Sequence, residues 1–296
     1  MNPQPQSKTE LEGLIYGLIG IVVFSLTLPA TRIAVADLDP IFVGLGRAIV
    51  AAVLALILLL ITRQQLPPGQ DFPRYCIVVA GVIIGFPLLS ALAMQGAPAS
   101  HGAVITGLLP LSTALCGVWR AGEKPSRRFW IFAVAGSTLV VIFALISGAG
   151  SIRSTDWALL GAVVAASLGY VEGAILAKKI GAWQVICWSL VLSVPVLLPI
   201  VLQHLPRSIE SVSTNAWWAF LYVSVFSMFL GFFAWYRGLA LGGIARIGQM
   251  QLLQPFLTIS ASAILLHEPL TTTTIGFAIA TIICVGLGRR SAISGK

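Results

Sequence analysis

The sequence predicts an all-α membrane protein whose ten transmembrane helices form two inverted repeats of five helices each. Three observations support this fold class. The composition is strongly apolar, a proline-containing segment occurs at matching places in the two halves, and lysine and arginine are concentrated in every second loop. The composition excludes an ordinary soluble protein, and the matched segments indicate a duplicated five-helix unit.

The amino-acid composition is that of a polytopic membrane protein. Of the 296 residues, 57% are hydrophobic and only 9% are charged, and the mean hydropathy is +0.95. Average soluble proteins carry about 25% charged residues. The net charge of +8 would suggest a nucleic-acid partner in a soluble protein. Here we expect the lipid bilayer as the partner and no nucleic acid, because lysine and arginine collect in the cytoplasmic loops of membrane proteins.

The apolar runs divide the chain into ten predicted spans joined by short loops. The length accommodates about ten spans of roughly 20 residues. The first run is too long for the apolar region of a cleaved signal peptide, so we expect it to remain as the first helix. The predicted organisation is a tail at 1–12, a first repeat at 13–147, a second repeat at 155–288 and a tail at 289–296. The predicted spans are 13–33, 40–62, 75–95, 100–120, 128–147, 155–177, 183–202, 216–237, 243–266 and 271–288.

The internal repeat is clearest in two proline-containing segments. Pro110 lies inside an apolar run that Glu123 ends 13 residues later, and Pro255 lies inside one that Glu268 ends at the same spacing. The two prolines are 145 residues apart, about half the chain. Apolar segments resemble one another by chance, but the matched spacing favours duplication. Proline-broken segments at corresponding places in two halves indicate a transporter built from repeats.

The positions of lysine and arginine predict the orientation of the helices. With the N-terminus in the cytoplasm, fourteen of these residues fall inside, three fall outside and Arg47 lies within a span. We therefore expect both termini to be cytoplasmic, in a plasma or bacterial inner membrane. Since each repeat has an odd number of spans, the second repeat is inverted relative to the first. The inside set is Lys8, Arg63, Arg74, Arg120, Lys124, Arg127, Arg128, Lys178, Lys179, Arg237, Arg246, Arg289, Arg290 and Lys296, and the outside set is Arg32, Arg153 and Arg207.

Pairs of glycine residues at a spacing of four predict close packing between helices. Small residues at this spacing share one helix face, where a neighbouring backbone can approach. The sequence assigns these faces no partner helix. The pairs are Gly13 with Gly17, Gly81 with Gly85, and Gly238 with Gly242.

These motifs resemble the EamA repeat of the drug/metabolite transporter superfamily. The resemblance rests on a small-residue loop, an apolar run with proline and a helix-ending glutamate, which occur here at 103–123 and 245–271. Tyr170 followed by Lys178 and Lys179 is similar to the segment of span 6 that ends in a basic pair in that family. The resemblance covers nearly the whole chain.

The family implies secondary transport without ATP, by ten helices in two inverted repeats with cytoplasmic termini. Many members export amino acids or other small metabolites, and a central cavity is lined by spans 1, 3, 4, 6, 8 and 9. The chain departs from the family pattern at Phe24 and Tyr170, where the aromatic residue is usually tryptophan. It also departs at Pro29, which interrupts span 1, and at Glu172.

Glu172 is the leading candidate for a role in transport, because it lies within span 6. A charge near the bilayer centre costs about 3 kcal/mol even on the gentlest scale, so an acid there usually faces a cavity or a partner. The functional interpretation is proton coupling or binding of a substrate amine. The alternative is an ion pair near the cytoplasmic mouth with Lys178, Lys179 or another basic side chain.

Arg47 and two glutamines are further candidates for substrate binding. The planar guanidinium of Arg47 suits a carboxylate, although the side chain could instead reach the lipid headgroups. Gln251 and Gln254 share a face of span 9, and Pro255 removes a helical hydrogen bond and frees a carbonyl near them. The alternative role of the glutamines is hydrogen bonding between helices.

Aromatic residues supply the remaining candidates for substrate contact. Tyr170 stands where the family places a cavity aromatic. Trp235 and Tyr236 end span 8, where aromatic residues either stack on a substrate or join the interfacial belt. His101 begins span 4 and is expected to cap the helix or meet headgroups, with proton transfer as the alternative.

Proline and glutamate residues are expected to shape the helix ends. Pro29, Pro110 and Pro255 predict helix breaks that could gate the pathway. Glu123 and Glu268 each precede the next helix, and we expect them to interact with its N-terminal amides.

The predicted function is secondary active transport, as an exporter of small polar or zwitterionic metabolites such as amino acids by alternating access. Protons are the candidate coupling ion. The alternatives are export of drugs, amphipathic compounds or lipids, and, from other classes, a channel or a membrane-embedded enzyme. No catalytic residue, metal site or cofactor is predicted, since the sequence has three histidines and no HExxH motif. The four cysteines lie in apolar runs without metal-ligand spacing, and we expect buried free thiols.

Overall fold

The computed structural model describes residues 8–121, 127–147 and 152–292, which form helices and no strand. Helical segments occupy all ten predicted places. In chain order, with η marking 3-10 and π-helices, they are α1 (Lys8–Ser25), α2 (Thr27–Ala34), η1 (Phe42–Gly46), α3 (Arg47–Ile61), η2 (Gly69–Asp71), α4 (Phe72–Val78), η3 (Val79–Gly85), α5 (Phe86–Gly96), α6 (Ala99–Thr106), α7 (Leu109–Ala121), α8 (Arg127–Ser147), α9 (Ser154–Ile180), α10 (Ala182–Gln203), α11 (Thr214–Tyr222), η4 (Val223–Leu230), α12 (Gly231–Gly242), α13 (Ile244–Gly248), η5 (Gln249–Leu253), α14 (Gln254–Leu265) and α15 (Thr272–Ala292).

Within the described residues, seven segments are long and apolar enough to cross a membrane. The predicted fifth and tenth spans contain shorter apolar helices, Trp130–Phe143 and Thr272–Cys284, and the predicted ninth span is divided among α13, η5 and α14. The prediction of a helical, multi-pass membrane protein is confirmed, and the number of ten spans stays a prediction. The seven segments are Leu11–Ala34, Phe42–Ile61, Gly69–Gly96, Ala99–Arg120, Ser154–Ile180, Ala182–Gln203 and Thr214–Gly242.

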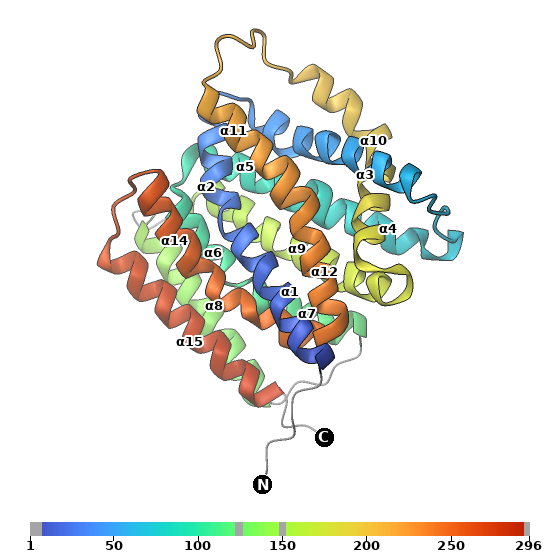
Figure 1. The fold of residues 1–296 in the computed structure, drawn as a ribbon. Helices are drawn as coiled ribbons and strands as arrows, with labels where there is room; N and C mark the ends of the chain where they lie inside the picture. The colour runs from blue at the N-terminus through green and yellow to red at the C-terminus, as the bar shows by residue number, and fades with distance from the viewer. Residues whose placement is uncertain (1–7, 122–126, 148–151, 293–296) are drawn as a thin grey trace.

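Helices from the first half of the chain pack against helices from the second half. In Figure 1, α1 and α12 lie side by side, as do α8 and α15. The helix α3 packs against α10, and α9 packs against both α5 and α7. Helices α1 and α9 belong to the corresponding predicted spans 1 and 6, and α5 and α12 belong to the corresponding spans 3 and 8. The contact of α1 with α12 therefore has its equivalent in the contact of α9 with α5. The halves therefore interlock into one body with a shared core.

The two halves approach each other closely at the glycine pairs. A Cβ atom on Gly13 would lie 2.8 Å from the backbone nitrogen of Gly242, and one on Gly238 would lie 2.8 Å from that of Gly17. A Cβ atom on Gly81 would lie 2.2 Å from the carbonyl oxygen of Ala165 in α9. Any larger side chain at these positions would push the paired helices apart.

The three prolines named above lie near breaks in the helices. Between α1 and α2 the α-helix is interrupted at Leu26, and Pro29 is the third residue of α2. Pro110 and Pro255 are each the second residue of the helix after a break, α7 and α14. Pro255 has no backbone N–H to donate to the carbonyl of Gln251. That carbonyl instead accepts the backbone N–H of Gln254. The expected free carbonyl is therefore absent at that position, because a 3-10 turn supplies a donor.

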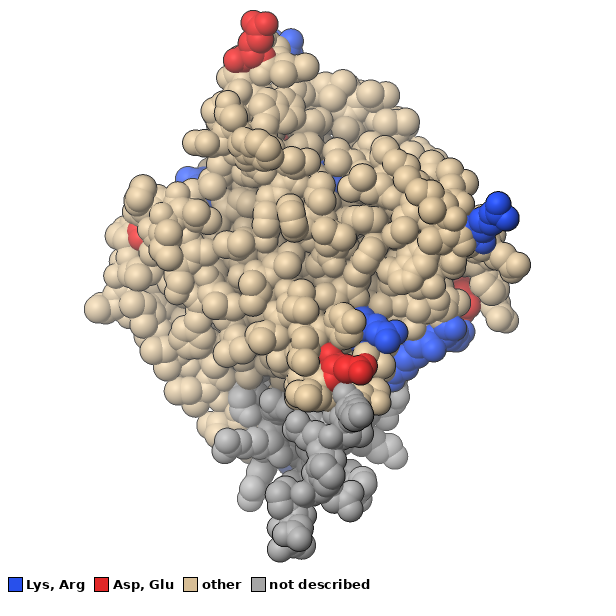
Figure 2. All heavy atoms as spheres, in the orientation of Figure 1, with Lys and Arg blue, Asp and Glu red and all other residues tan. Residues whose placement is uncertain are grey.

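The surface of the molecule suits a lipid environment. Most of the face in Figure 2 carries no Lys, Arg, Asp or Glu, and the charged side chains that are visible lie near its edges. Large apolar side chains such as Ile61 and Ile264 are exposed. The described cysteines are free. Cys187 is buried, but Cys76 is exposed, so burial of all four thiols was a wrong expectation. Cys76 lies on the outward face of α4, whereas Tyr75 and Val78 of the same helix are buried.

Candidate functional site

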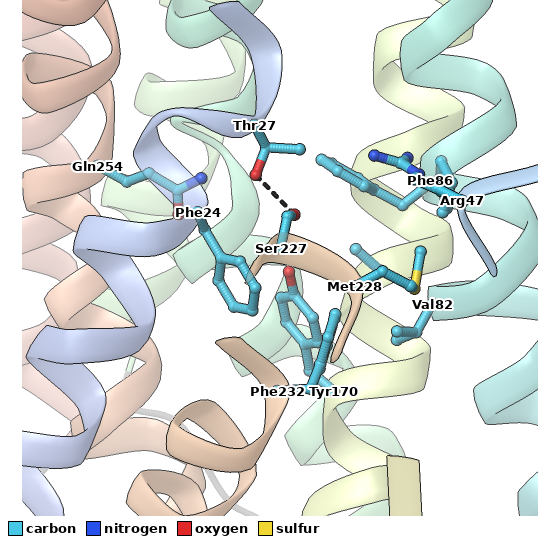
Figure 3. Close-up of a pocket in the computed structure, with 12 residues that line it drawn as sticks. Phe24, Thr27, Arg47, Val82, Phe86, Tyr170, Ser227, Met228, Phe232 and Gln254 are labelled. Atoms are coloured by element: carbon cyan, nitrogen blue, oxygen red, sulfur yellow. Dashed lines mark hydrogen bonds between the residues drawn. The ribbon is translucent and has the colours of Figure 1, made fainter. Parts of the chain in front are cut away.

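A cavity in the middle of the molecule is lined by segments from both halves of the chain (Figure 3). The space between the lining side chains, together with the open solvent at its mouth, is about 370 Å³. The lining comes from predicted spans 1, 2, 3, 6, 8 and 9, so Arg47 adds span 2 to the expected set, and the lining does not include span 4. The lining residues are Phe24, Thr27, Arg47, Val82, Phe86, Pro87, Ala166, Tyr170, Ser227, Met228, Phe232 and Gln254.

Two π-helical segments line this cavity, and a third directly precedes one of its lining residues. The segments η3 and η4 contribute Val82, Ser227 and Met228 to its wall. Arg47 directly follows η1. A π-helix widens the helical turn and turns side chains away from their ordinary direction, and such segments are frequent at functional sites. Segments η3 and η4 also lie at matching places in the two halves. The apolar pattern contained no signal for these segments.

Arg47 is the one charged residue among the described residues that line the cavity. Only 1% of the residue is exposed, and its guanidinium group points from α3 toward the other lining residues, beside Phe86 (Figure 3). Its Nε donates to the carbonyl oxygen of Gly44 at 3.3 Å. Its Nη2 has no hydrogen-bond partner among the described residues. The alternative that Arg47 reaches the lipid headgroups is therefore wrong, because packing around η1 encloses the side chain.

The other polar groups of the cavity are uncharged. The hydroxyl groups of Thr27 and Ser227 share a hydrogen bond of 2.8 Å that joins α2 to η4. Gln254 is 8% exposed, and its Oε1 has no partner in the described part of the chain. Gln251 is also buried, and both polar atoms of its amide are likewise without a described partner. Of the two glutamines, Gln254 lines the cavity and Gln251 does not.

Aromatic side chains form most of the remaining wall and its backing. The ring centroids of Phe24 and Phe232 are 4.9 Å apart. Behind them, Trp235 meets Tyr170 at 5.5 Å between centroids. Tyr236 donates to the carbonyl oxygen of Gly169 at 3.2 Å. Trp235 and Tyr236 are both fully buried, so they support the cavity without lining it, and their assignment to an interfacial belt is wrong.

Glu172 lies beyond the cavity along α9 and binds two arginines. Its side chain is fully buried. One carboxylate oxygen lies 2.7 Å from Arg74 of α4, and the other lies 2.5 Å from Arg120 of α7. Each arginine side chain is about one third exposed, 34% and 33%. Both carboxylate oxygens are thus occupied, as in the ion-pair alternative, although by other basic residues than Lys178 or Lys179.

A second polar group lies at the other end of α9. His101 Nε2 lies 2.6 Å from Oδ1 of Asp156, and both residues are buried. The imidazole ring packs 5.0 Å from the ring of Phe143 between centroids. The expectation that His101 caps a helix or meets headgroups is therefore wrong. Asp156 and Glu172 are separated by 16 residues of one helix, about 24 Å at 1.5 Å per residue.

Glu268 closes a long-range contact at this same end. Its two carboxylate oxygens accept the backbone N–H groups of Ala99 at 2.7 Å and Ser100 at 2.9 Å, at the start of α6. A carboxylate there satisfies open amides and meets the positive end of the helix dipole. We expected Glu268 to serve the next helix, α15, but Thr271 accepts the N–H of Thr274 there. Glu123 lies outside the described residues.

Several side chains of the candidate site and of the ion pairs beside it were missed from the sequence alone. Arg74 and Arg120 were counted only as cytoplasmic charges, and Thr27, Ser227 and Asp156 were not singled out. Of these residues, only Asp156 could have been found from its position in the sequence. It lies near the start of a predicted span, where the positive end of the helix dipole favours an acidic side chain.

A cavity lined by helices of both halves of a multi-pass membrane protein is the arrangement expected of a transporter built from repeats. The chain belongs to the EamA-like transporter family, which it matches over residues 11–146 and again over residues 153–287. Members of this family are transporters and not enzymes. The resemblance found in the sequence is thereby confirmed.

Relatives agree with this assignment. The chain is 50% identical over 280 residues to the "Uncharacterized transporter YdeK" of Bacillus subtilis (strain 168), covering 95% of this chain and 98% of that protein. It is 24% identical to the "Uncharacterized transporter YvbV" of the same organism, covering 96% and 93%. A solved crystal structure at 15% identity shares the fold, with a TM-score of 0.69 over 94% of this chain and 96% of that one.

Proposed function

We propose that the protein is a secondary active transporter that exports small polar or zwitterionic metabolites, such as amino acids, by alternating access. The observation that carries this proposal is the central cavity, which is lined by segments of both halves. Polar contacts between helices lie on either side of it, around Glu172 and around Asp156. When one set of contacts separates, a cavity between them becomes accessible from that side of the membrane while the other side stays closed.

The arrangement of the two halves supports an inverted repeat. Three features occur at matching places in the two halves: the contacts of α1 with α12 and of α9 with α5, the segments η3 and η4, and the pair Pro110 and Pro255. With an odd number of spans per repeat, the halves have opposite orientations. We place the protein in the cell membrane with both termini in the cytoplasm, because that orientation leaves most basic residues inside.

In this orientation the two groups of contacts act as gates. The Glu172 cluster lies on the cytoplasmic side of the cavity, and it ties α9 to α4 and α7. The contacts of Asp156 and Glu268 lie on the outer side, and both join α6 to a distant segment. Opening toward the cytoplasm requires the Glu172 cluster to separate, and opening outward requires the second group to separate. Pro29, Pro110 and Pro255 lie at breaks where helix halves can tilt.

Glu172 is also the residue we propose for proton coupling. For that role the carboxylate must leave at least one arginine when the cytoplasmic gate opens, and it must bind a proton while free. Transport by a Glu172→Gln variant provides the test. Full proton-dependent transport by this variant would rule out the coupling role and leave Glu172 as a gate residue only.

The function is tested with purified protein in liposomes that contain pooled radiolabelled amino acids. We expect efflux that depends on an imposed pH gradient and stops when an ionophore collapses the gradient. Protein-free liposomes provide the control. Flux that is insensitive to the gradient would indicate facilitated diffusion or exchange, and would contradict secondary active transport driven by protons.

The aromatic wall supports a second candidate substrate class, amphipathic drugs or lipids. Phe24, Phe86 and Phe232 offer apolar contact without charge recognition. Competition between amphipathic cations and amino acids for flux separates the two classes. Inhibition by cations alone would favour the drug class.

A further inference from the structure

We infer that the substrate of this cavity is a carboxylate with an apolar body, that its acid group binds Arg47, and that an amino group is not required for recognition. The inference rests on the proposed transport function and identifies the chemical group of the substrate that the cavity recognises. The cavity combines one buried cation with a wall whose other described residues carry no charge.

The guanidinium of Arg47 is prepared to bind an anion. The residue is 1% exposed, and its Nη2 has no described hydrogen-bond partner. The bond from Nε to Gly44 holds one edge of the side chain. A buried charge without a partner is strongly unfavourable. Proteins therefore retain such a charge mainly where a ligand or ion of opposite charge pairs with it. Planar guanidinium groups match carboxylates with two parallel hydrogen bonds.

The described wall of the cavity provides no acid to balance this charge. None of its twelve lining residues is Asp or Glu. The nearest acid along α9, Glu172, already binds Arg74 and Arg120. A cationic ligand would therefore meet an unbalanced positive charge, and an ammonium group would find only neutral acceptors. This pattern favours an anion over a cation and makes a zwitterion's amine dispensable.

The rest of the wall determines the body of the ligand. In Figure 3, Phe24 lies to the left of the cavity and Tyr170 and Phe232 lie below it, whereas Arg47 is at the upper right. Met228 and Val82 add aliphatic surface. Such a wall stabilises an apolar or aromatic group by burial and ring contact. Thr27 and Ser227 share one hydrogen bond, which leaves the O–H of the accepting hydroxyl free to donate. Gln254, whose Oε1 has no partner in the described part of the chain, is a further neutral group for a polar substituent.

The test uses four compounds that share one aromatic body and differ in their polar groups. They are 3-phenylpropionate, L-phenylalanine, phenethylamine and 3-phenylpropanamide. Binding to purified wild-type protein is measured by calorimetry and by the shift in melting temperature. We expect the two carboxylates to bind, and the amine and the amide to bind at least about tenfold more weakly, a difference of about 1.4 kcal/mol. Equal binding of the amine or the amide, or binding by none of the four, would overturn the inference.

Variants at position 47 separate recognition from structure. Arg47→Gln is expected to lose the preference for carboxylates and to melt at a higher temperature without ligand, because an unbalanced buried charge is removed. Arg207→Gln, at an exposed arginine, is the matched control and should keep both properties. Arg47→Lys retains charge without the planar fork and should bind carboxylates more weakly. Unchanged preference for carboxylates in Arg47→Gln, or unchanged carboxylate affinity in Arg47→Lys, would contradict the role of Arg47.

Binding and flux answer different questions. Carboxylate-selective binding without any flux in liposomes would refute the transport function and leave the recognition site intact. Flux of ligands that need no carboxylate would refute the recognition site and leave the transport function intact.

Discussion

Arg120 and Glu172 join α7 to α9 through a contact of 2.5 Å between Nε and a carboxylate oxygen. The acid is fully buried, whereas the arginine is one third exposed. The pair therefore connects the inside of the helix bundle to its edge. With Arg74 on the other carboxylate oxygen, it holds three segments together at one end of the cavity.

Glu172→Gln should destabilise the protein. The change leaves Arg74 and Arg120 without the carboxylate that both bind, and their partial exposure to solvent reduces the loss. We expect the unfolding free energy to fall by about 1–3 kcal/mol, seen as a lower melting temperature in detergent. Glu12→Gln, at an exposed acid of α1, is the control. Equal melting of the two variants would show that the cluster does not stabilise this conformation.

The glycine contact between the halves gives a second prediction. Gly13→Ala places a Cβ atom 2.8 Å from the backbone of Gly242, so α1 and α12 must move apart, at a cost of about 1–3 kcal/mol. Gly276→Ala is the matched control in α15, because nothing lies within 4 Å of its Cβ position. The control should be neutral or slightly stabilising. Thermal unfolding of both variants provides the comparison, and similar melting would contradict close packing at Gly13.

The contact of Glu268 with α6 gives a third prediction. Glu268→Gln replaces a carboxylate that accepts two backbone N–H groups, so about 0.5–2 kcal/mol should be lost. The loss should be local, and amide exchange at Ala99 and Ser100 should accelerate. Glu210→Gln, at an exposed acid, should leave that exchange unchanged. Unaltered protection of α6 in Glu268→Gln would exclude the capping role.

Asp37 gives a prediction for pH. It lies in the loop between α2 and η1, where hydrogen bonds from Ser213, through its side chain and its backbone N–H, lower the pKa of Asp37 below the ordinary value of 3.8. The folded state therefore holds its proton less tightly than the unfolded chain. The stabilisation is complete above the ordinary pKa and is lost as the pH falls through the lowered value.

The measurement compares wild type with Asp37→Asn across this pH range. The melting temperature of wild type should exceed that of the variant at neutral pH, and the difference should shrink only below about pH 4. A difference that is constant down to pH 2, or that grows as the pH falls, would contradict the direction of the shift.

Much of the architecture could be predicted because a membrane constrains it strongly. Long apolar runs must be helical, since backbone groups in lipid need internal hydrogen bonds. The helical segments accordingly occupy the expected places. The matched positions of Pro110 and Pro255 and the spacing to the following glutamate identified the duplication, and the family match over two segments supports it.

The sequence also placed three cavity residues among its candidates, Tyr170, Arg47 and Gln254. It could not separate these from Trp235 and Tyr236, which back the cavity. The reason is that helices in lipid are apolar on all sides, so periodicity does not reveal which face turns inward. The π-helical segments also change the direction in which the following side chains point, and no residue pattern predicted these segments.

The sequence by itself determined that this chain is a helical membrane transporter with a duplicated plan, because apolar length and repeated motifs are properties of the chain read in order. Only the tertiary structure decided the partners of its charges. Glu268 binds Ala99 across 169 positions, and Glu172 binds Arg74 across 98. Arg47 is left as a buried cation that faces the cavity. These relationships depend on the rotation and packing of distant helices, and short-range electrostatics acts only after packing has brought the side chains together.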